Sequence, residues 1–248
     1  MTRDSTQSAA TPTIGQVTLI GLFVTALVTA QLTASKILGF SIPVELPIAG
    51  AQLALPGAAL AYAVTFLASD CYSELYGRRA AQVMVNVGFA MNFVLLVLVW
   101  STIAAPVSPA SPVAADTFAT VLGASTNIVI ASLLAYVVSQ NWDVLAFHRL
   151  REYTDGDHLW LRNVGSTASS QAIDTVIFVT VGFALAPAVL GSGEPAGVDL
   201  LASLIVGQYL LKLLIAVVDT PVVYAIVGAI REYGLDGAAL DSAGRTGD

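Results

Sequence analysis

Two nine-residue segments of the chain carry the same polar residues at the same spacing. Residues 139–147 read SQNWDVLAF and residues 170–178 read SQAIDTVIF, and both fit the pattern S-Q-x-x-D-x-x-x-F. A glutamine amide donates and accepts hydrogen bonds at once, and a carboxylate accepts two charge-assisted bonds from a planar ligand. Each segment lies at or inside a long apolar run, where such polar side chains are unfavourable unless they have a hydrogen-bonding partner or a ligand. Four matched positions in nine, without wider similarity, are weak evidence for a duplicated half.

Six ionisable side chains also lie inside apolar runs. A charge near the centre of a bilayer costs on the order of 3 kcal/mol, so such a side chain normally faces a cavity or a partner and indicates function. The alternative is a buried ion pair, Lys212 with Asp174 or Asp219, that only fixes the register of two helices. The six residues are Lys36, Asp70, Glu74, Asp174, Lys212 and Asp219.

The spacing of these residues places several of them on common helix faces. Gln208, Lys212 and Asp219 follow the i, i+4, i+11 spacing of one face, and shorter polar stripes occur in three other apolar runs. Four helices therefore direct polar faces towards a common interior. We expect a substrate-binding site built from Gln31, Lys36, Asp70, Glu74, Gln140, Gln171, Asp174, Gln208, Lys212 and Asp219.

Depth along the helices distinguishes the two copies of the repeated pattern. With a rise of about 1.5 Å per residue, Asp174 lies about 16 Å from one membrane face and Lys212 about 18 Å from the other. Both charges therefore reach the middle of a ~30 Å hydrocarbon core and could meet there. The copy at 170–178, which contains Asp174, is therefore the deeper one, and we expect it to bind a ligand. Asp143, close to His148 and Arg149, is expected to anchor the inner end of its helix by pairing with arginine.

The composition is that of a membrane protein. Of the 248 residues, 56% are hydrophobic and 11% are charged, and the mean hydropathy is +0.78, whereas soluble domains carry about 25% charged residues. A net charge of −7 with ten Lys plus Arg argues against direct binding of nucleic acid. The lone Cys71 excludes an internal disulfide and any multi-cysteine metal site.

Six apolar runs approach or exceed the ~20 residues that cross a bilayer. They predict an all-α bundle of six transmembrane helices in a domain spanning 14–230, between a polar tail at 1–13 and an acidic tail at 231–248. The first run is too long for a signal-peptide core and is interpreted as a retained span. The runs cover about 14–38, 55–76, 80–104, 118–147, 164–190 and 200–230.

The distribution of arginines predicts the orientation. Three connections rich in Pro, Gly and Ser, at 39–52, 105–116 and 191–199, contain no Lys or Arg. The other connections and the tails hold eight arginines, and positively charged loops stay in the cytoplasm. Both termini are therefore expected to be cytoplasmic, in a multi-pass protein of the cell membrane.

Four segments together resemble a known family. The chain is similar to the queuosine precursor transporter family, also called the vitamin-uptake-transporter-like family, over nearly everything between the two tails. The motifs occur in the same order as in that family. They are FLASDCYSELYG at 66–77, SLLAYVVSQNWDVLAFHRLR at 132–151, WLRNVGSTASSQAIDTVIF at 160–178 and YLLKLLIAVVDTPVVYAI at 209–226.

The resemblance implies a six-span importer of 7-deazaguanine bases, the cyano- or aminomethyl-substituted precursors of queuosine or archaeosine, for salvage in tRNA modification. The first helix departs from the family pattern: relatives often have an asparagine before the lysine, where this chain reads QLTASKIL, which concerns Gln31 and Lys36. The other family motif residues fall on Asp70, Glu74, Gln140, Asp143, Phe147, Arg149, Asp174, Thr175 and Lys212.

The chemistry of such a base fits the candidate residues independently. A guanine-like ring presents an N1–H and an amino group side by side, which one carboxylate, Asp174 or Glu74, can accept as two hydrogen bonds. A glutamine amide suits the carbonyl and pyrrole edges. Phe or Trp can stack on the flat face of the ring.

Two other functions share some of these features. The membrane-embedded binding subunit of an ATP-driven vitamin importer would need ATPase partners, because the chain has no G-x-x-x-x-G-K-[ST] loop. An intramembrane aspartyl protease could use Asp174 and Asp219, but no G-x-G-D stretch surrounds either. We therefore expect a transporter rather than an enzyme, without cofactor or metal, with a small-molecule substrate. A second copy of the chain is a candidate partner.

Overall fold

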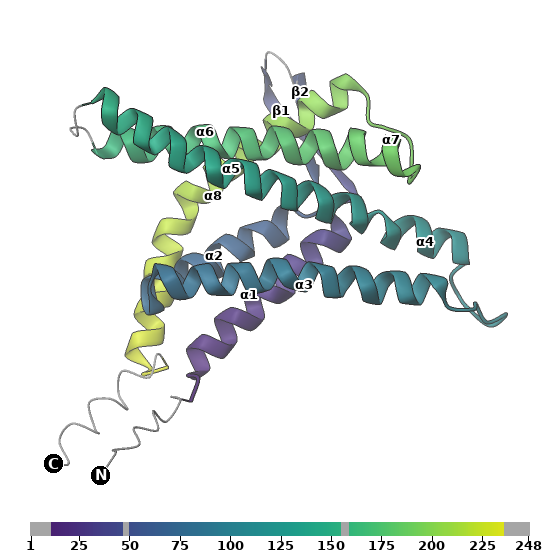
Figure 1. Cartoon of the computed structure of the whole chain (residues 1–248), viewed down its shortest axis with the longest axis horizontal. Coiled ribbons are helices and arrows are strands. Elements are labelled where there is room, and N and C mark those ends of the chain that lie inside the picture. The colour runs from purple at the N-terminus through teal and green to yellow at the C-terminus, as the bar shows by residue number, and fades with distance from the viewer. Residues whose placement is uncertain (1–10, 47–49, 155–158, 236–248) are drawn as a thin grey trace, which may run out of the picture.

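The chain folds almost entirely into helices, joined by one small hairpin (Figure 1). The computed structural model describes residues 11–46, 50–154 and 159–235. The elements in chain order, with η1 a π-helical turn, are α1 (Ile14–Thr33), β1 (Ile37–Leu46), β2 (Gly50–Pro56), α2 (Ala59–Tyr76), α3 (Arg78–Ala104), α4 (Ala115–Gly123), α5 (Ser125–Tyr153), α6 (Leu159–Thr180), η1 (Val181–Leu185), α7 (Ala186–Leu190) and α8 (Val198–Glu232).

Five helical segments of the described chain are long and apolar enough to cross a membrane. The helix α2 is not among them, because Asp70, Glu74 and several tyrosines make its 18 residues less apolar than the others. The predicted polytopic helical membrane protein is thus confirmed in its coarse form. The five segments are Ile14–Thr33, Arg78–Ala104, Ala115–Tyr153, Val164–Leu190 and Val198–Glu232.

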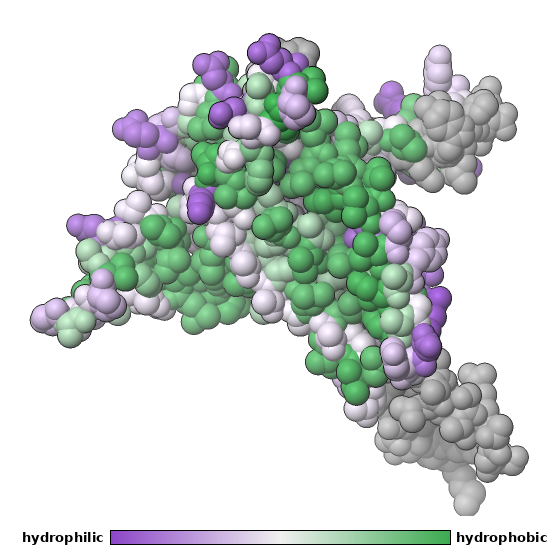
Figure 2. Space-filling model, turned by 180° about the vertical axis from the view of Figure 1, so that it is seen from behind, coloured by the Kyte–Doolittle hydropathy of each residue, from purple (hydrophilic) through white to green (hydrophobic). Residues whose placement is uncertain are grey.

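The outside of the bundle is apolar, as a lipid environment requires. Figure 2 shows a broad hydrophobic surface with polar side chains gathered towards its margins. Leu60, Val97 and Val217 are between 68% and 76% exposed, which would be unfavourable for so large an apolar area in water. Hydrocarbon solvates these side chains without cost, so the surface is suited to a bilayer.

The ends of successive long helices alternate between two sides of the molecule (Figure 1). The start of α1, the α2–α3 turn, the end of α5, the start of α6 and the end of α8 lie along the left of the view, from its upper to its lower part. We call this the arginine side, since it carries Arg78, Arg79, Arg149, Arg151 and Arg231. The β1–β2 hairpin and the α3–α4 and α7–α8 connections lie opposite, on the hairpin side.

The hairpin was not predicted from the sequence. The first helix was expected to reach residue 38 but ends at Thr33, and the expected loop after it pairs antiparallel from Ile37 opposite Pro56 to Leu46 opposite Gly50. The hairpin is fixed to α8, because Ser203 Oγ accepts from the Ala54 N–H and donates to the Gln52 carbonyl, each at 3.1 Å. Gly207 lies directly against the Ala54 carbonyl, with no room for a side chain.

A π-helical turn interrupts the helix that begins at Leu159. Phe178 lies shortly before this turn, and Phe183 lies within it. The two side chains are 3% and 9% exposed, and their rings pack edge to face with centroids 6.1 Å apart. In a regular α-helix, two side chains five residues apart point about 140° away from each other, so the two rings would face different directions. The wider π turn brings both into one core cluster with Ala131 and Leu204.

Candidate functional site

An ion pair between α6 and α8 lies at the centre of the candidate site. Lys212 Nζ is 2.6 Å from Asp174 Oδ2, and the two side chains are only 11% and 25% exposed. Both charges give up hydration to meet, so removing either partner leaves the other unpaired in an apolar setting. The meeting of these two charges, anticipated from their depth, is observed.

The two copies of the repeated pattern bind each other across the antiparallel helices α5 and α6. Ser139 Oγ donates to Asp174 Oδ1, and Ser170 Oγ donates to Asp143 Oδ1, both at 3.3 Å. The serine of each copy therefore meets the aspartate of the other, in a local twofold arrangement. The expected arginine partner of Asp143 was wrong: among the described residues this carboxylate forms no ion pair, and Ser170 is its partner.

A cavity of about 210 Å³ lies beside the ion pair, enclosed by α1, α2, α3, α5, α6 and α8. We call it the central cavity. Its aromatic wall includes Phe89, which stacks on Tyr136 with centroids 4.5 Å apart, and Tyr62, which packs edge to face with Phe178. Its polar lining consists of Thr65, Ser69, Ser132, Ser139, Gln140, Gln171, Asp174, Gln208 and Lys212.

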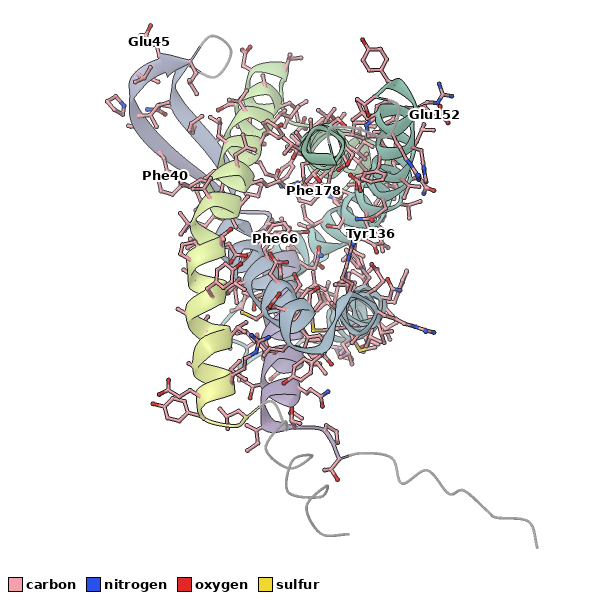
Figure 3. All side chains as sticks on the ribbon, turned by 90° about the vertical axis from the view of Figure 1, so that its left-hand side faces the viewer. Phe40, Glu45, Phe66, Tyr136, Glu152 and Phe178 are labelled. Atoms are coloured by element: carbon pink, nitrogen blue, oxygen red, sulfur yellow. The ribbon has the colours of Figure 1, made fainter. Side chains whose placement is uncertain are left out.

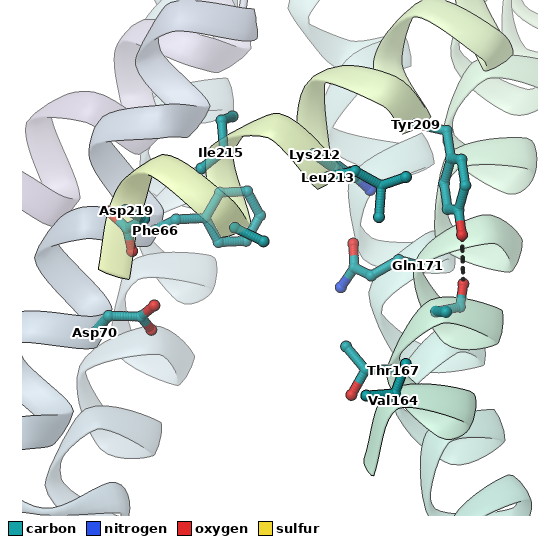
Figure 4. Close-up of a pocket in the computed structure, with 12 residues that line it drawn as sticks. Phe66, Asp70, Val164, Thr167, Gln171, Tyr209, Lys212, Leu213, Ile215 and Asp219 are labelled. Atoms are coloured by element: carbon teal, nitrogen blue, oxygen red, sulfur yellow. Dashed lines mark hydrogen bonds between the residues drawn. The ribbon is translucent and has the colours of Figure 1, made fainter. Parts of the chain in front are cut away.

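A second, larger cavity of about 470 Å³ lies between α2, α6 and α8, towards the arginine side (Figure 4). We call it the arginine-side cavity. Phe66, Gln171 and Lys212 line both cavities and so form the wall between them. Tyr209 borders it with its hydroxyl donating to the Ala168 carbonyl at 3.3 Å. Lys212, one member of the ion pair, therefore lies between the two cavities.

Two carboxyl groups face each other at the α2–α8 side of the arginine-side cavity. Asp70 of α2 and Asp219 of α8 both line this cavity, and Asp219 is only 9% exposed (Figure 4). Neither residue has a basic partner in the part of the chain that the structure describes.

Three buried amide side chains lack hydrogen-bond partners for some or all of their polar atoms. Both amide atoms of Gln31 and of Asn92 are unpaired, as is Oε1 of Gln208, and the three side chains are 1%, 0% and 9% exposed. Asn92 was missed by the sequence reasoning. The available signal was an asparagine near the middle of the apolar run at 80–104, where unpaired amides are unfavourable.

The predicted site residues fall into three groups. Gln140, Gln171, Asp174, Gln208 and Lys212 gather around the central cavity. Asp70 and Asp219 line the arginine-side cavity, and Gln31 is buried in α1.

Besides Gln31, the structure leaves two more predicted residues outside both cavities. Lys36 was expected inside the first helix but follows its end and is exposed. Glu74 is exposed on the arginine side, 3.6 Å from Arg231. Within the described residues, no group of three or more His, Cys, Asp or Glu side chains is placed to hold a metal ion.

The sequence comparisons agree with this geometry. A family model described as "Putative vitamin uptake transporter" matches residues 56–226, from the end of β2 into α8. The chain belongs to this family. The match to the vitamin uptake transporter family includes every residue of the central and arginine-side cavities except Phe23 and Leu27 of α1.

A named relative narrows the comparison. The chain is 33% identical over 165 residues to a protein of Bacillus subtilis (strain 168) named "Probable queuosine precursor transporter". The aligned region covers 66% of this chain and 68% of the relative. No solved structure matches the chain significantly.

Proposed function

We propose that this member of the vitamin uptake transporter family imports 7-deazaguanine bases, the precursors of queuosine or archaeosine, across the plasma membrane. The observation that carries the proposal is its 33% identity to the Bacillus subtilis protein named "Probable queuosine precursor transporter". The central cavity supports it, because 210 Å³ is below the ~300–1,000 Å³ of sites for drug-sized ligands and suits a single bicyclic base.

The free hydrogen-bonding capacity of the central cavity matches the edge of such a base. Asp174 Oδ2 is held by Lys212, but Oδ1 receives only a long bond from Ser139, whose hydroxyl is shared with the Tyr136 carbonyl. Oδ1 and the unpaired Oε1 of Gln208 are therefore two acceptors for the N1–H and amino group of the base. Lys212 can donate to the ring carbonyl.

The aromatic wall would hold the flat ring. Tyr62, Phe66 and Phe178 border the same cavity and offer apolar faces or edges to a bicyclic base. A purine lacking the amino group would leave one buried acceptor unpaired, which is the usual origin of strong discrimination. The cavity therefore has the means to select guanine-like bases by their hydrogen-bonding edge.

Uptake of labelled bases tests the proposal. Cells that can neither make nor otherwise import deazaguanines should accumulate labelled 7-cyano- or 7-aminomethyl-7-deazaguanine only when they express this chain. Adenine at the same concentration should not compete, whereas the unlabelled deazaguanine should. Equal uptake with and without the chain would contradict the proposal.

We also propose six membrane spans, with α2 as the sixth and the arginine side in the cytoplasm. The alternation of helix ends in Figure 1 supports it, because each long helix, α2 included, runs from one side to the other. Phosphatase or fluorescent fusions after Asp248 and at residue 155 should report a cytoplasmic position, and a fusion at Ser192 an external one. An external carboxyl terminus would contradict six spans.

Transport rather than catalysis is what the arrangement favours. Asp174 is paired with Lys212, whereas Asp219 lines the arginine-side cavity with Asp70, so the two aspartates suggested for a protease have different surroundings. Membership of a transporter family supports the same conclusion. We propose that the chain imports the base directly across the bilayer, without ATPase subunits.

A further inference from the structure

The unpaired amides of Gln31 and Asn92 lie outside both cavities, and neither is used in the proposed binding of the base. Each is at least 99% buried, and none of their four amide atoms has a hydrogen-bond partner. Every such group costs about 1–3 kcal/mol when it is left without a partner. Two amides at this cost are unexpected in a packed core unless another state of the protein pairs them.

The position of the two amides is set by the contact between α1 and α3. Phe23 and Leu27 of α1 pack directly against Gly88 of α3, where the missing side chain allows the helices to approach. Gln31 follows Leu27 by one turn, and Asn92 follows Gly88 by one turn, both in the direction of the hairpin side. By this spacing, each amide lies one turn beyond the contact between α1 and α3, which we call the seam, towards the hairpin side.

The rest of the seam shows which side of the molecule is closed. Leu27 lines the central cavity from α1, and Phe89 lines it from α3. On the hairpin side of these residues, the neighbouring core is close-packed, with Ala30, Ala34 and Ile128 at most 2% exposed. On the arginine side, the larger cavity adjoins the ion pair. The structure is therefore closed towards the hairpin side.

We propose that Gln31 and Asn92 line the outer entrance for the base. When α1 separates from α3, the two amides become accessible from outside and bind the hydrogen-bonding edge of the base before it reaches the central cavity. Their donors and acceptors, unpaired in the closed seam, are then satisfied by the base and by water. This role rests on the proposed import of deazaguanines and on the external position of the hairpin side.

Cysteine accessibility tests the seam without requiring any knowledge of the substrate. Cys71 is the lone cysteine and is fully buried, so Cys71→Ala provides the background. In that background, Asn92→Cys or Gln31→Cys in intact cells should react with a membrane-impermeant maleimide added outside. Excess 7-cyano-7-deazaguanine should slow the labelling at least fivefold. Met84→Cys is the matched control, because Met84 is buried on the same face of α3, two turns towards the arginine side, and should stay unlabelled.

A second pair of variants separates an entrance role from a packing role. Asn92→Leu and Gln31→Leu replace the unpaired amides with an apolar side chain of similar shape, so each protein should be at least as thermally stable as wild type. We expect the initial rate of uptake to fall about tenfold in each. Unchanged uptake in both Leu variants, or no external labelling at either position, would overturn the proposal. If cells that express the wild-type chain take up no deazaguanine while the cysteine variants are still labelled from outside, the proposed substrate is wrong but the position of the entrance is supported.

Discussion

Replacing Asp174 with Asn is expected to reduce uptake of the labelled base to background, about 100-fold, while the protein is still made and inserted. The amide keeps one acceptor for Ser139 but loses the charge that holds Lys212 at 2.6 Å. A hydrogen bond to a charged group contributes about 1.5–3 kcal/mol, and the same carboxylate is the proposed acceptor for the base. Initial uptake rates, normalised to the amount of protein in the membrane, measure the effect.

The other copy of the repeated pattern provides a matched control. Asp143 occupies the equivalent position and accepts a 3.3 Å bond from Ser170, but it has no ion-pair partner among the described residues. Asn can accept the same bond, so Asp143→Asn should keep uptake within about threefold of wild type by this reasoning. Equal loss in both variants would mean that the serine–aspartate contacts, rather than the ion pair, are what transport needs.

The double variant Lys212→Met with Asp174→Leu is expected to fold and yet to be inactive. Removing only one member of the buried pair leaves a charge unpaired at a cost of about 3–5 kcal/mol, whereas removing both relieves that penalty. The protein should therefore be recovered from the membrane in normal amounts and unfold at or above the wild-type temperature. Uptake should stay at background, because the proposed acceptor and donor for the base are both gone.

The same double variant distinguishes a binding site from an ion pair that only fixes helix register. If the pair had only that role, replacing it with apolar side chains of similar size would restore uptake along with folding. Uptake near the wild-type rate would therefore contradict our assignment. The unpaired Oε1 of Gln208 beside the pair favours a ligand, since one ion pair needs no further acceptor.

The charged residues of the site could be predicted because hydropathy marks them directly. Lys212 and Asp174 are rare charges in apolar runs, and a count along two helices suffices to place them at the same depth. The reciprocal contact between the repeated patterns could not be predicted in the same way. It depends on the register of α5 against α6, which brings Ser139 to Asp174 and Ser170 to Asp143.

The predictions were wrong or incomplete where the structure depends on contacts between segments that are far apart in the sequence. The apolar run through Lys36 reads as one helix, yet the chain leaves the helix at Thr33 and forms a hairpin held by Ser203 of α8, far away in sequence. Asn92 was overlooked because the prediction relied on charged residues and on repeated polar patterns, and a single neutral amide belongs to neither. Only the structure shows that its amide has no partner.

The π-helical turn at Val181–Leu185 has a consequence for how relatives of this protein can differ in length. Adding or deleting one residue in a regular membrane helix rotates everything beyond it by about 100° and exchanges lipid-facing with core-facing side chains. A π turn accommodates one additional residue without that exchange, and here it keeps Phe178 and Phe183 in one cluster. Single-residue gaps in alignments of α6 should therefore fall within this turn, and homologues without the additional residue should retain both aromatic positions four residues apart.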